Sequence, residues 1–225
     1  MSSFSCWSLK GGSGTTVVAV GLASLLGRRH PAGALIVDLA GDVFAALGES
    51  EPRGPGVAEW LAAGPAVAPD GWGRLAVPAA PHLTVVPRGR GPLLCGERAD
   101  VLAGMLAADE RPVVIDCGVL LAPDDVSSVV TGAHVLAASA TRSWLVTRYC
   151  YLSLRRCARL PLLPSGVVGM QEPGRALRAV DVEAAVGAPV VATVPYDPAV
   201  ARAVDRGALG GALPKPLERA LRAAA

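Results

Sequence analysis

The stretch Lys10-Gly11-Gly12-Ser13-Gly14-Thr15-Thr16 decides the fold of this chain. It lies between an apolar run, predicted as a strand over Phe4–Leu9, and a helix predicted over Thr16–Arg29. Glycines let the backbone wrap so that several N–H groups face one anion, and the start of the helix adds its dipole. The stretch therefore predicts a phosphate-binding loop. The alternative is an ordinary glycine-rich turn between a strand and a helix.

The lysine content makes this loop unusual. The chain has two lysines against nineteen arginines, and Lys10 is one of the two. The phosphate-loop pattern has a lysine directly before its last Ser or Thr, and Thr15 occupies that position here. Thr16 occupies the position whose hydroxyl would reach a magnesium ion. The loop therefore keeps an early lysine and lacks the usual phosphate lysine.

The composition excludes several classes of protein. The 225 residues are 52% hydrophobic, which is ample for a core, and the formal net charge of +2 is too small to indicate nucleic-acid binding by itself. The five cysteines form no Cys-x-x-Cys pair, which favours reduced thiols over a disulfide frame or a zinc site. No apolar run approaches the roughly 18 residues of a membrane span, and Met1–Leu9 is too short and too polar for a signal peptide. We expect a cytoplasmic protein without a transmembrane segment.

Short apolar strands alternate with helical stretches along the whole chain. The predicted strands are Phe4–Leu9, Ala34–Leu39, Leu83–Pro87, Val113–Cys117, Val135–Ser139, Gly166–Gly169 and Val190–Val194. The predicted helices are Thr16–Arg29, Val57–Ala63, Gly96–Ala108, Asp124–Val130, Ser143–Arg159, Ala179–Val186, Pro198–Arg206 and Pro216–Ala224. The pattern predicts a single three-layer α/β domain over residues 1–225, similar to the P-loop NTPases. Its central sheet is mostly parallel, with helices on both faces.

Two of the predicted strands end in aspartate. Asp38 ends the run Ala34-Leu35-Ile36-Val37-Asp38, and Asp116 ends the run Val113-Val114-Ile115-Asp116. The carboxyl ends of parallel strands meet at one edge of a sheet, so both carboxylates are expected beside the glycine loop. There they would suit a second-shell role at magnesium and the orientation of a water molecule. The alternative is turn formation, which is common for aspartate.

These residues resemble the deviant Walker A ATPases, the ParA/MinD group, whose loop reads Lys-Gly-Gly-x-Gly-Lys-Thr. Lys10 matches the family's signature lysine, which reaches across a nucleotide-sandwiched dimer to the partner's phosphates. The run from Val190 to Gly207 resembles the family's late strand, its Pro-x-Asp turn and the following helix. The resemblance covers nearly the whole chain. It implies ATP or ADP with Mg²⁺ as cofactors, a nucleotide-dependent homodimer, and protein partners of a larger complex.

The resemblance also implies roles for individual residues. It implies that Lys10, Asp38 and Asp116 are catalytic, and that Thr16, Asp38 and Asp116 bind magnesium. Nucleotide binding falls on Lys10, Gly11, Gly12, Ser13, Gly14, Thr15, Thr16, Pro195 and Asp197.

Two departures from the family pattern both affect hydrolysis. Thr15 replaces the charged loop lysine, and Ala40 occupies the place of a second aspartate that positions the attacking water; Asp42 lies two residues further on. We therefore expect retained nucleotide binding with weak or absent hydrolysis. Loops altered in this way are typical of the branch resembling CpaE/TadZ, which places Flp/Tad pilus machinery at a cell pole, and of a related septum-site-determining branch. Those proteins often carry an N-terminal receiver-like domain; because this sequence opens on the first predicted strand, we expect a bare ATPase-like module.

Two segments of the chain are candidate surfaces for binding a protein, DNA or a membrane. The predicted helix Ser143–Arg159 places Arg148, Arg155 and Arg159 on one face, which indicates a protein partner or a solvated surface more than nonspecific DNA binding. The last ten residues have one short apolar stripe, too weak for stable membrane binding, and predict a closing helix. Recruitment to the membrane or a cell pole would then depend on partners.

Four functions remain open. The leading one is a nucleotide-binding spatial organiser of pilus, secretion or division machinery. The others are an active partitioning ATPase that binds DNA, a small-molecule enzyme on the same scaffold, and a pseudo-ATPase interaction domain that binds no nucleotide. Thr15 counts against the small-molecule enzyme, because phosphoryl transfer needs the loop lysine.

Overall fold

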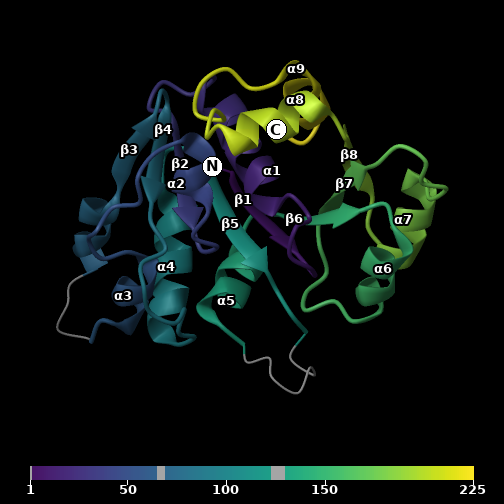
Figure 1. Ribbon diagram of the computed structural model, residues 1–225. Coiled ribbons are helices and arrows are strands. Elements are labelled where there is room, and N and C mark those ends of the chain that lie inside the picture. The colour runs from purple at the N-terminus through teal and green to yellow at the C-terminus, as the bar shows by residue number, and fades with distance from the viewer. Residues whose placement is uncertain (1, 65–68, 123–129) are drawn as a thin grey trace.

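The computed structural model describes residues 2–64, 69–122 and 130–225, which form an eight-stranded sheet with helices on both faces (Figure 1). Every neighbouring pair of strands is parallel except β3 and β4, so the predicted, mostly parallel α/β fold is confirmed. The strand order is β3 (Val77–Ala80), β4 (Leu83–Val86), β2 (Ala34–Asp38), β5 (Val113–Val119), β1 (Ser3–Ser8), β6 (Arg142–Arg148), β7 (Gly166–Gln171) and β8 (Val190–Pro195).

Alternate residues of the central strands pack against two separate layers of helices. In β2, Ala34 and Ile36 belong to one apolar cluster, and Leu35 and Val37 belong to the other. The first cluster includes residues of α1 (Thr15–Gly27), α2 (Val43–Leu47), α8 (Pro198–Asp205) and α9 (Lys215–Leu221). The second includes residues of α3 (Val57–Ala62), α4 (Glu97–Ala108), α5 (Gly132–Ser139), α6 (Tyr151–Leu154) and α7 (Ala179–Val186). Burial on both faces explains why these strands are continuous apolar runs.

The strand predicted over Val135–Ser139 is wrong, because these residues belong to helix α5. A short apolar run does not distinguish a buried strand from a buried helix by periodicity alone. The start of the helix is fixed by residues that the prediction overlooked. The backbone N–H of Thr131 donates to Nδ1 of His134 at 3.1 Å, as in a capping box.

The helix predicted over Ser143–Arg159 is wrong in its first half, and only its second half, from Tyr151 to Ala158, is helical. Residues Arg142–Arg148 form strand β6, which pairs with β1 and β7 near the middle of the sheet. The run Trp144-Leu145-Val146-Thr147 is buried, and its aromatic and β-branched residues favour a strand. The predicted basic helix face therefore loses Arg148, which ends a strand, while Arg155 and Arg159 stand in and at the end of a short 3₁₀ segment, Arg155–Ala158, after α6.

The remaining differences are smaller. Strand β3 was not predicted; it is a short edge strand that contains Pro78, and proline is tolerated at a sheet edge. A second 3₁₀ segment spans Pro69–Leu75. In the helix predicted over Asp124–Val130, residues 124–129 lie outside the described part, and Val130 belongs to no helix or strand. Helix α9 buries Leu217 and Leu221 in the core, which confirms the closing helix. Within the described ranges, no helix has both the length and the apolar character needed to cross a membrane.

Candidate functional site

The glycine loop connects β1 to α1 and wraps around one of its own carbonyl groups. The hydroxyls of Ser13 and Ser8 both donate to the carbonyl oxygen of Lys10, at 2.7 Å and 3.1 Å. Gly12 and Gly14 have φ angles of 74° and 88°, in the left-handed region that favours glycine. These contacts hold the loop in the curved form that phosphate-binding loops require.

The start of helix α1 is open to an anion. Gly14 occupies the N-cap, no side chain caps the helix, and its first turn contains no acidic residue. The first N–H groups of a helix have no partner within the helix, and the helix dipole is positive there. Loop and helix start together form an anion-binding arrangement.

A hollow of about 240 Å³ lies against this loop, and we call it the loop hollow. Gly11–Val17 form one wall, and Ser8 lies at the end of β1. Ala40 and Asp42, which follow β2, and Gly118 and Val119, which end β5, also line the hollow. The parallel sheet therefore brings the predicted loop and both predicted strand ends to one edge.

Asp116 is fully buried behind the loop hollow. Its Oδ1 accepts from the backbone N–H of Gly118 at 3.2 Å, whereas its Oδ2 has no hydrogen-bond partner. Burial raises the pKa of Asp116 to about 7, and the negative charge of Asp38 acts in the same direction. The hydroxyl of Thr16 and the Gly118 N–H oppose this shift. A buried carboxylate oxygen without a partner is costly, which indicates a site built for a further ligand.

Asp38 lies beside Asp116 in the register of β2 and β5, but its oxygens already have partners. Oδ1 accepts from the N–H groups of Ala40 and Gly41, at 3.0 Å and 2.6 Å, and Oδ2 accepts from Val43 at 3.0 Å. Burial raises the pKa of Asp38, while these three donors oppose the shift. The hydrogen bonds of Asp38 are those of a turn former that organises the chain between β2 and α2.

Lys10 lies at the start of the loop but lines no wall of the loop hollow. Its side chain is half-buried and makes no hydrogen bond or ion pair within the described part of the chain. The loop therefore leaves one cationic group without an internal partner next to the anion-binding arrangement.

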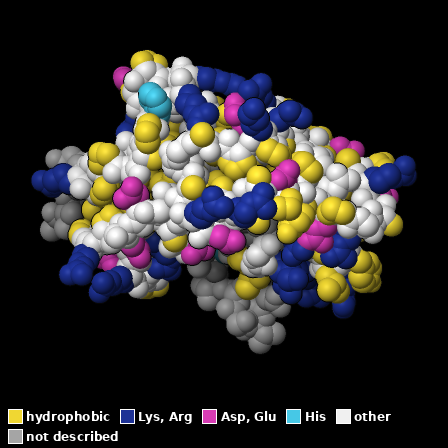
Figure 2. Space-filling model, turned by 45° about the horizontal axis from the view of Figure 1, so that its top comes forward, with side chains coloured by type: hydrophobic (Ala, Val, Ile, Leu, Met, Phe, Trp, Pro, Cys, Tyr) yellow, Lys and Arg dark blue, Asp and Glu magenta, His cyan; other side chains and the backbone are white. Residues whose placement is uncertain are grey.

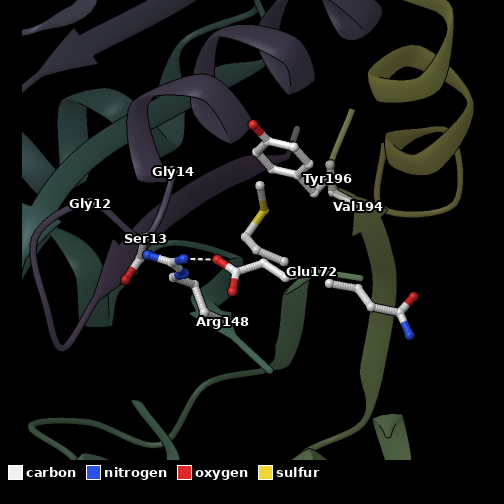
Figure 3. A pocket seen from close by; sticks show the side chains of 9 residues that line it. Gly12, Ser13, Gly14, Arg148, Glu172, Val194 and Tyr196 are labelled. Carbon is white, nitrogen blue, oxygen red and sulfur yellow. Dashed lines mark ion pairs between the residues drawn. The ribbon is translucent and has the colours of Figure 1, made fainter. Parts of the chain in front are cut away.

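A second hollow, of about 230 Å³, lies on the other side of the same loop, and we call it the Met170 hollow. Gly12–Gly14 belong to both hollows. Figure 3 shows Arg148 and Glu172 pointing toward each other across this hollow, where they form an ion pair. Glu172 also pairs with Arg175 at 2.7 Å. Val194 and Tyr196, from the end of β8, complete the lining with Met170 and Gln171.

The late strand contributes other residues than those predicted. Pro195 and Asp197 line neither hollow, whereas Val194 and Tyr196 line the Met170 hollow. The Asp197 carboxylate instead accepts from the backbone N–H of Ala199 at 2.7 Å and caps helix α8.

Sequence reasoning missed the residues of β6 and β7 that line the Met170 hollow. The prediction places Arg148 in a helix and therefore does not bring it to a strand end beside the loop, where the structure has it. An available signal was position: Arg148, Gln171 and Glu172 all stand at or just after the carboxyl end of a strand.

Comparisons with known proteins agree with this geometry. No protein-family model matches the chain, and no curated protein matches it. Among solved structures, a ParA family ATPase from Chlorobium tepidum is 18% identical, with a TM-score of 0.69 over 98% of this chain and 95% of that chain. The cell division ATPase MinD of Pyrococcus furiosus is 22% identical, with a TM-score of 0.68 over 97% of this chain and 94% of that chain. The septum site-determining protein MinD of Pyrococcus horikoshii, complexed with Mg-ADP, is 18% identical. Its TM-score is 0.65 over 92% of this chain and 86% of that chain. The chain therefore has the fold of the ParA and MinD ATPases.

Proposed function

We propose that this protein is a ParA/MinD-like spatial organiser that binds ATP or ADP with Mg²⁺ and hydrolyses ATP weakly or not at all. One observation carries the proposal. The glycine loop is curved around the uncapped start of α1, and the unpartnered Oδ2 of Asp116 lies buried behind it. A plain structural turn needs neither an open helix start nor a buried carboxylate oxygen without a partner.

The two hollows suit the two ends of a nucleotide. The loop hollow offers backbone N–H groups and a helix start, which fit phosphates. The Met170 hollow offers Met170, Val194 and Tyr196, which fit the faces and edges of a base. Because both hollows share Gly12–Gly14, one nucleotide would span them around the loop.

The protein oxygen atoms at the loop hollow suit a magnesium ion that phosphate oxygens also bind. Mg²⁺ in nucleotide sites uses one or two protein ligands and completes its shell with water and phosphate oxygens. Thr16 lines the loop hollow, and Asp116 lies behind it with one oxygen unused. We assign the ion to Thr16 with Asp116 in support, and we assign Asp38 to the turn that holds Asp42 at the hollow.

The residues at the hollow support slow hydrolysis. Thr15 is 7% exposed and contributes a hydroxyl where the family has a mobile positive charge. Ala40 lines the hollow where the family has a carboxylate, and Asp42, two residues further on, lines the same hollow. Without the loop lysine, charge on the transferring phosphoryl group has little stabilisation.

Lys10 supports a dimer as the working form. Its ammonium has no partner within the described residues, and it stands beside an arrangement made for phosphates. We propose that it contacts the nucleotide held by a second copy. A nucleotide-dependent dimer would then recruit protein partners of pilus, secretion or division machinery, and those partners would fix its place in the cytoplasm, at the membrane or at a cell pole.

Thermal unfolding with increasing Mg·ATP tests the proposal. A ligand that binds the folded state raises the unfolding temperature progressively above its dissociation constant. We expect a clear rise with ATP and with ADP, together with turnover far below that of an active partitioning ATPase. Ordinary ATPase turnover with salt-dependent DNA binding would favour the partitioning ATPase. No shift at millimolar nucleotide would favour the pseudo-ATPase domain.

A further inference from the structure

A third hollow, of about 470 Å³, lies beside the glycine loop and has three arginines in its wall. We call it the arginine hollow: Arg155, Arg156 and Arg159 face Leu9 and Leu121. Leu9 directly precedes Lys10, and Leu121 follows the end of β5. Nothing in the proposed nucleotide site uses these arginines.

No acidic side chain is among the described residues that line the arginine hollow. Arg156 donates from Nη1 to the carbonyl oxygen of Leu9 at 3.2 Å, which fixes it against the loop strand. Arg155 and Arg159 have no hydrogen bond or ion pair within the described residues. The sequence from Val126 to Gln171 contains five arginines and no aspartate or glutamate, although the whole chain has a net charge of only +2. Local positive charge is therefore concentrated here.

Exposed apolar side chains extend the hollow. Tyr151 and Leu152 are 71% and 59% exposed, although they lie in the same short helical segment as the buried Ser153 and Cys157. At helical spacing, positions 151, 152, 155, 156 and 159 share the solvent-facing side, so two apolar residues lead directly into three arginines. Figure 2 shows Lys/Arg and hydrophobic side chains side by side at the lower right, where α6 lies in Figure 1.

We propose that this surface docks a protein partner through an acidic segment that also carries an apolar side chain. The arginines would bind its carboxylates, and Tyr151, Leu152 and Leu121 would contact the apolar side chain. Tyrosine and arginine are the residues that most often dominate binding energy at protein interfaces. Charge complementarity indicates the class of partner, because the described residues that line this hollow include three cations and no anion.

The shape and composition favour a protein over a membrane or DNA. One tyrosine and one leucine bury too little apolar area for stable membrane binding. The phosphates of a DNA duplex line a convex rod, which does not enter a concave hollow, and Tyr151 and Leu152 add nothing to phosphate binding. An acidic peptide chain can place a carboxylate in the hollow and an apolar group beside it.

The test is selection of random displayed peptides on the immobilised full-length chain, with Arg155→Glu/Arg159→Glu protein in solution to remove peptides that bind elsewhere. We expect recovered peptides to be enriched in Asp and Glu next to an apolar residue. In fluorescence anisotropy, the double variant should bind them at least about tenfold more weakly, as expected when hot-spot arginines are lost. The matched control, Arg202→Glu/Arg219→Glu, makes the same charge change on α8 and α9 and should bind them normally.

If the double variant unfolds at the same temperature as the wild type, its lower affinity comes from the two substituted side chains and not from a loss of folding. The proposal is overturned if no acidic peptide is recovered, or if both double variants bind the peptides equally. It is also overturned if Arg155 and Arg159 are instead needed for binding a short DNA duplex or vesicles containing phosphatidylglycerol. All measurements are made without nucleotide, so failure here is distinguishable from failure of nucleotide binding.

Discussion

Two aspartates that occupy equivalent strand positions have different environments. Asp38 and Asp116 are paired in register on neighbouring strands, and both are buried. Three backbone N–H groups satisfy Asp38, whereas Asp116 accepts from one backbone N–H and has one oxygen without a hydrogen-bond partner. The sequence predicts a functional role for both, and their hydrogen bonds differ: both oxygens of Asp38 are used by a turn, and one oxygen of Asp116 is not used. Sequence alone does not separate them, because the difference depends on the path of the chain after each strand.

The raised pKa of Asp116 predicts that the free energy of unfolding falls as the pH rises. The folded-state pKa of about 7 lies above the ordinary value of 3.8, so the folded protein binds more protons between these values and loses stability as pH rises through them. Between pH 5 and pH 8, wild-type protein should lose about 3 kcal/mol of unfolding free energy relative to Asp116→Asn. Urea unfolding at both pH values measures this. Parallel pH profiles for the two proteins would show that Asp116 is not the group responsible.

Restoring the missing charge should restore hydrolysis. The variant Thr15→Lys/Ala40→Asp returns the phosphate lysine and the second carboxylate to the loop hollow. Removing a preorganised group that stabilises transition-state charge costs enzymes about a hundredfold or more, so turnover should rise at least about tenfold. A steady-state phosphate-release assay measures turnover, with Ala40→Asp alone as control. A wild-type rate equal to that of the double variant would contradict this account of Thr15.

At the scale of elements, most apolar runs were assigned correctly, and two neighbouring ones were not. Strands β1, β2, β4, β5, β7 and β8 and helix α1 follow the prediction to within a few residues. The errors adjoin each other, at α5 and β6, where both segments are short, apolar and buried. Burial on all sides erases the contrast between polar and apolar positions on which periodicity depends. The Met170 hollow was missed for this reason, since it requires the end of β6.

The curvature of the loop should depend on one glycine more than on its neighbour. Gly12 has φ 74° and Gly11 does not lie in this region, while a Cβ at either position meets no atom within 4 Å. Gly12→Ala should therefore strain the loop by roughly 1–2 kcal/mol and weaken nucleotide binding, whereas Gly11→Ala should have a small effect. Calorimetric titration with Mg·ATP compares them. Equal affinities for the two variants would show that the curved loop does not hold phosphate.

At the scale of the whole molecule, the sheet brings distant parts of the chain to one edge. The glycine loop, the turn after β2, the end of β5 and the ends of β6–β8 all border the loop hollow or the Met170 hollow. The arginine hollow lies on the same side of the molecule through Leu9 and Leu121. If both proposals hold, this edge combines the proposed nucleotide site with the proposed surface for a partner.

Dimerisation should require the lysine at the start of the loop. Lys10→Ala removes a side chain that has no partner in the described protomer, so the monomer should keep its unfolding temperature. The dimer formed with Mg·ATP should be lost or weakened at least about tenfold, because a charge-assisted contact with phosphate disappears. Sedimentation velocity with and without nucleotide measures this, and Lys215→Ala removes the other lysine as the control. An undiminished dimer in Lys10→Ala would rule out the cross-dimer role.

The most direct test of the central claim is the chemical state of nucleotide bound at equilibrium. The full-length chain is incubated with Mg²⁺ and ATP labelled on the γ-phosphate, separated from free nucleotide by rapid gel filtration, and the bound label is identified by chromatography. The account predicts bound, intact ATP that persists over many minutes and that is lost in Gly12→Ala. Recovery of protein without nucleotide, or rapid release of labelled phosphate, would contradict it.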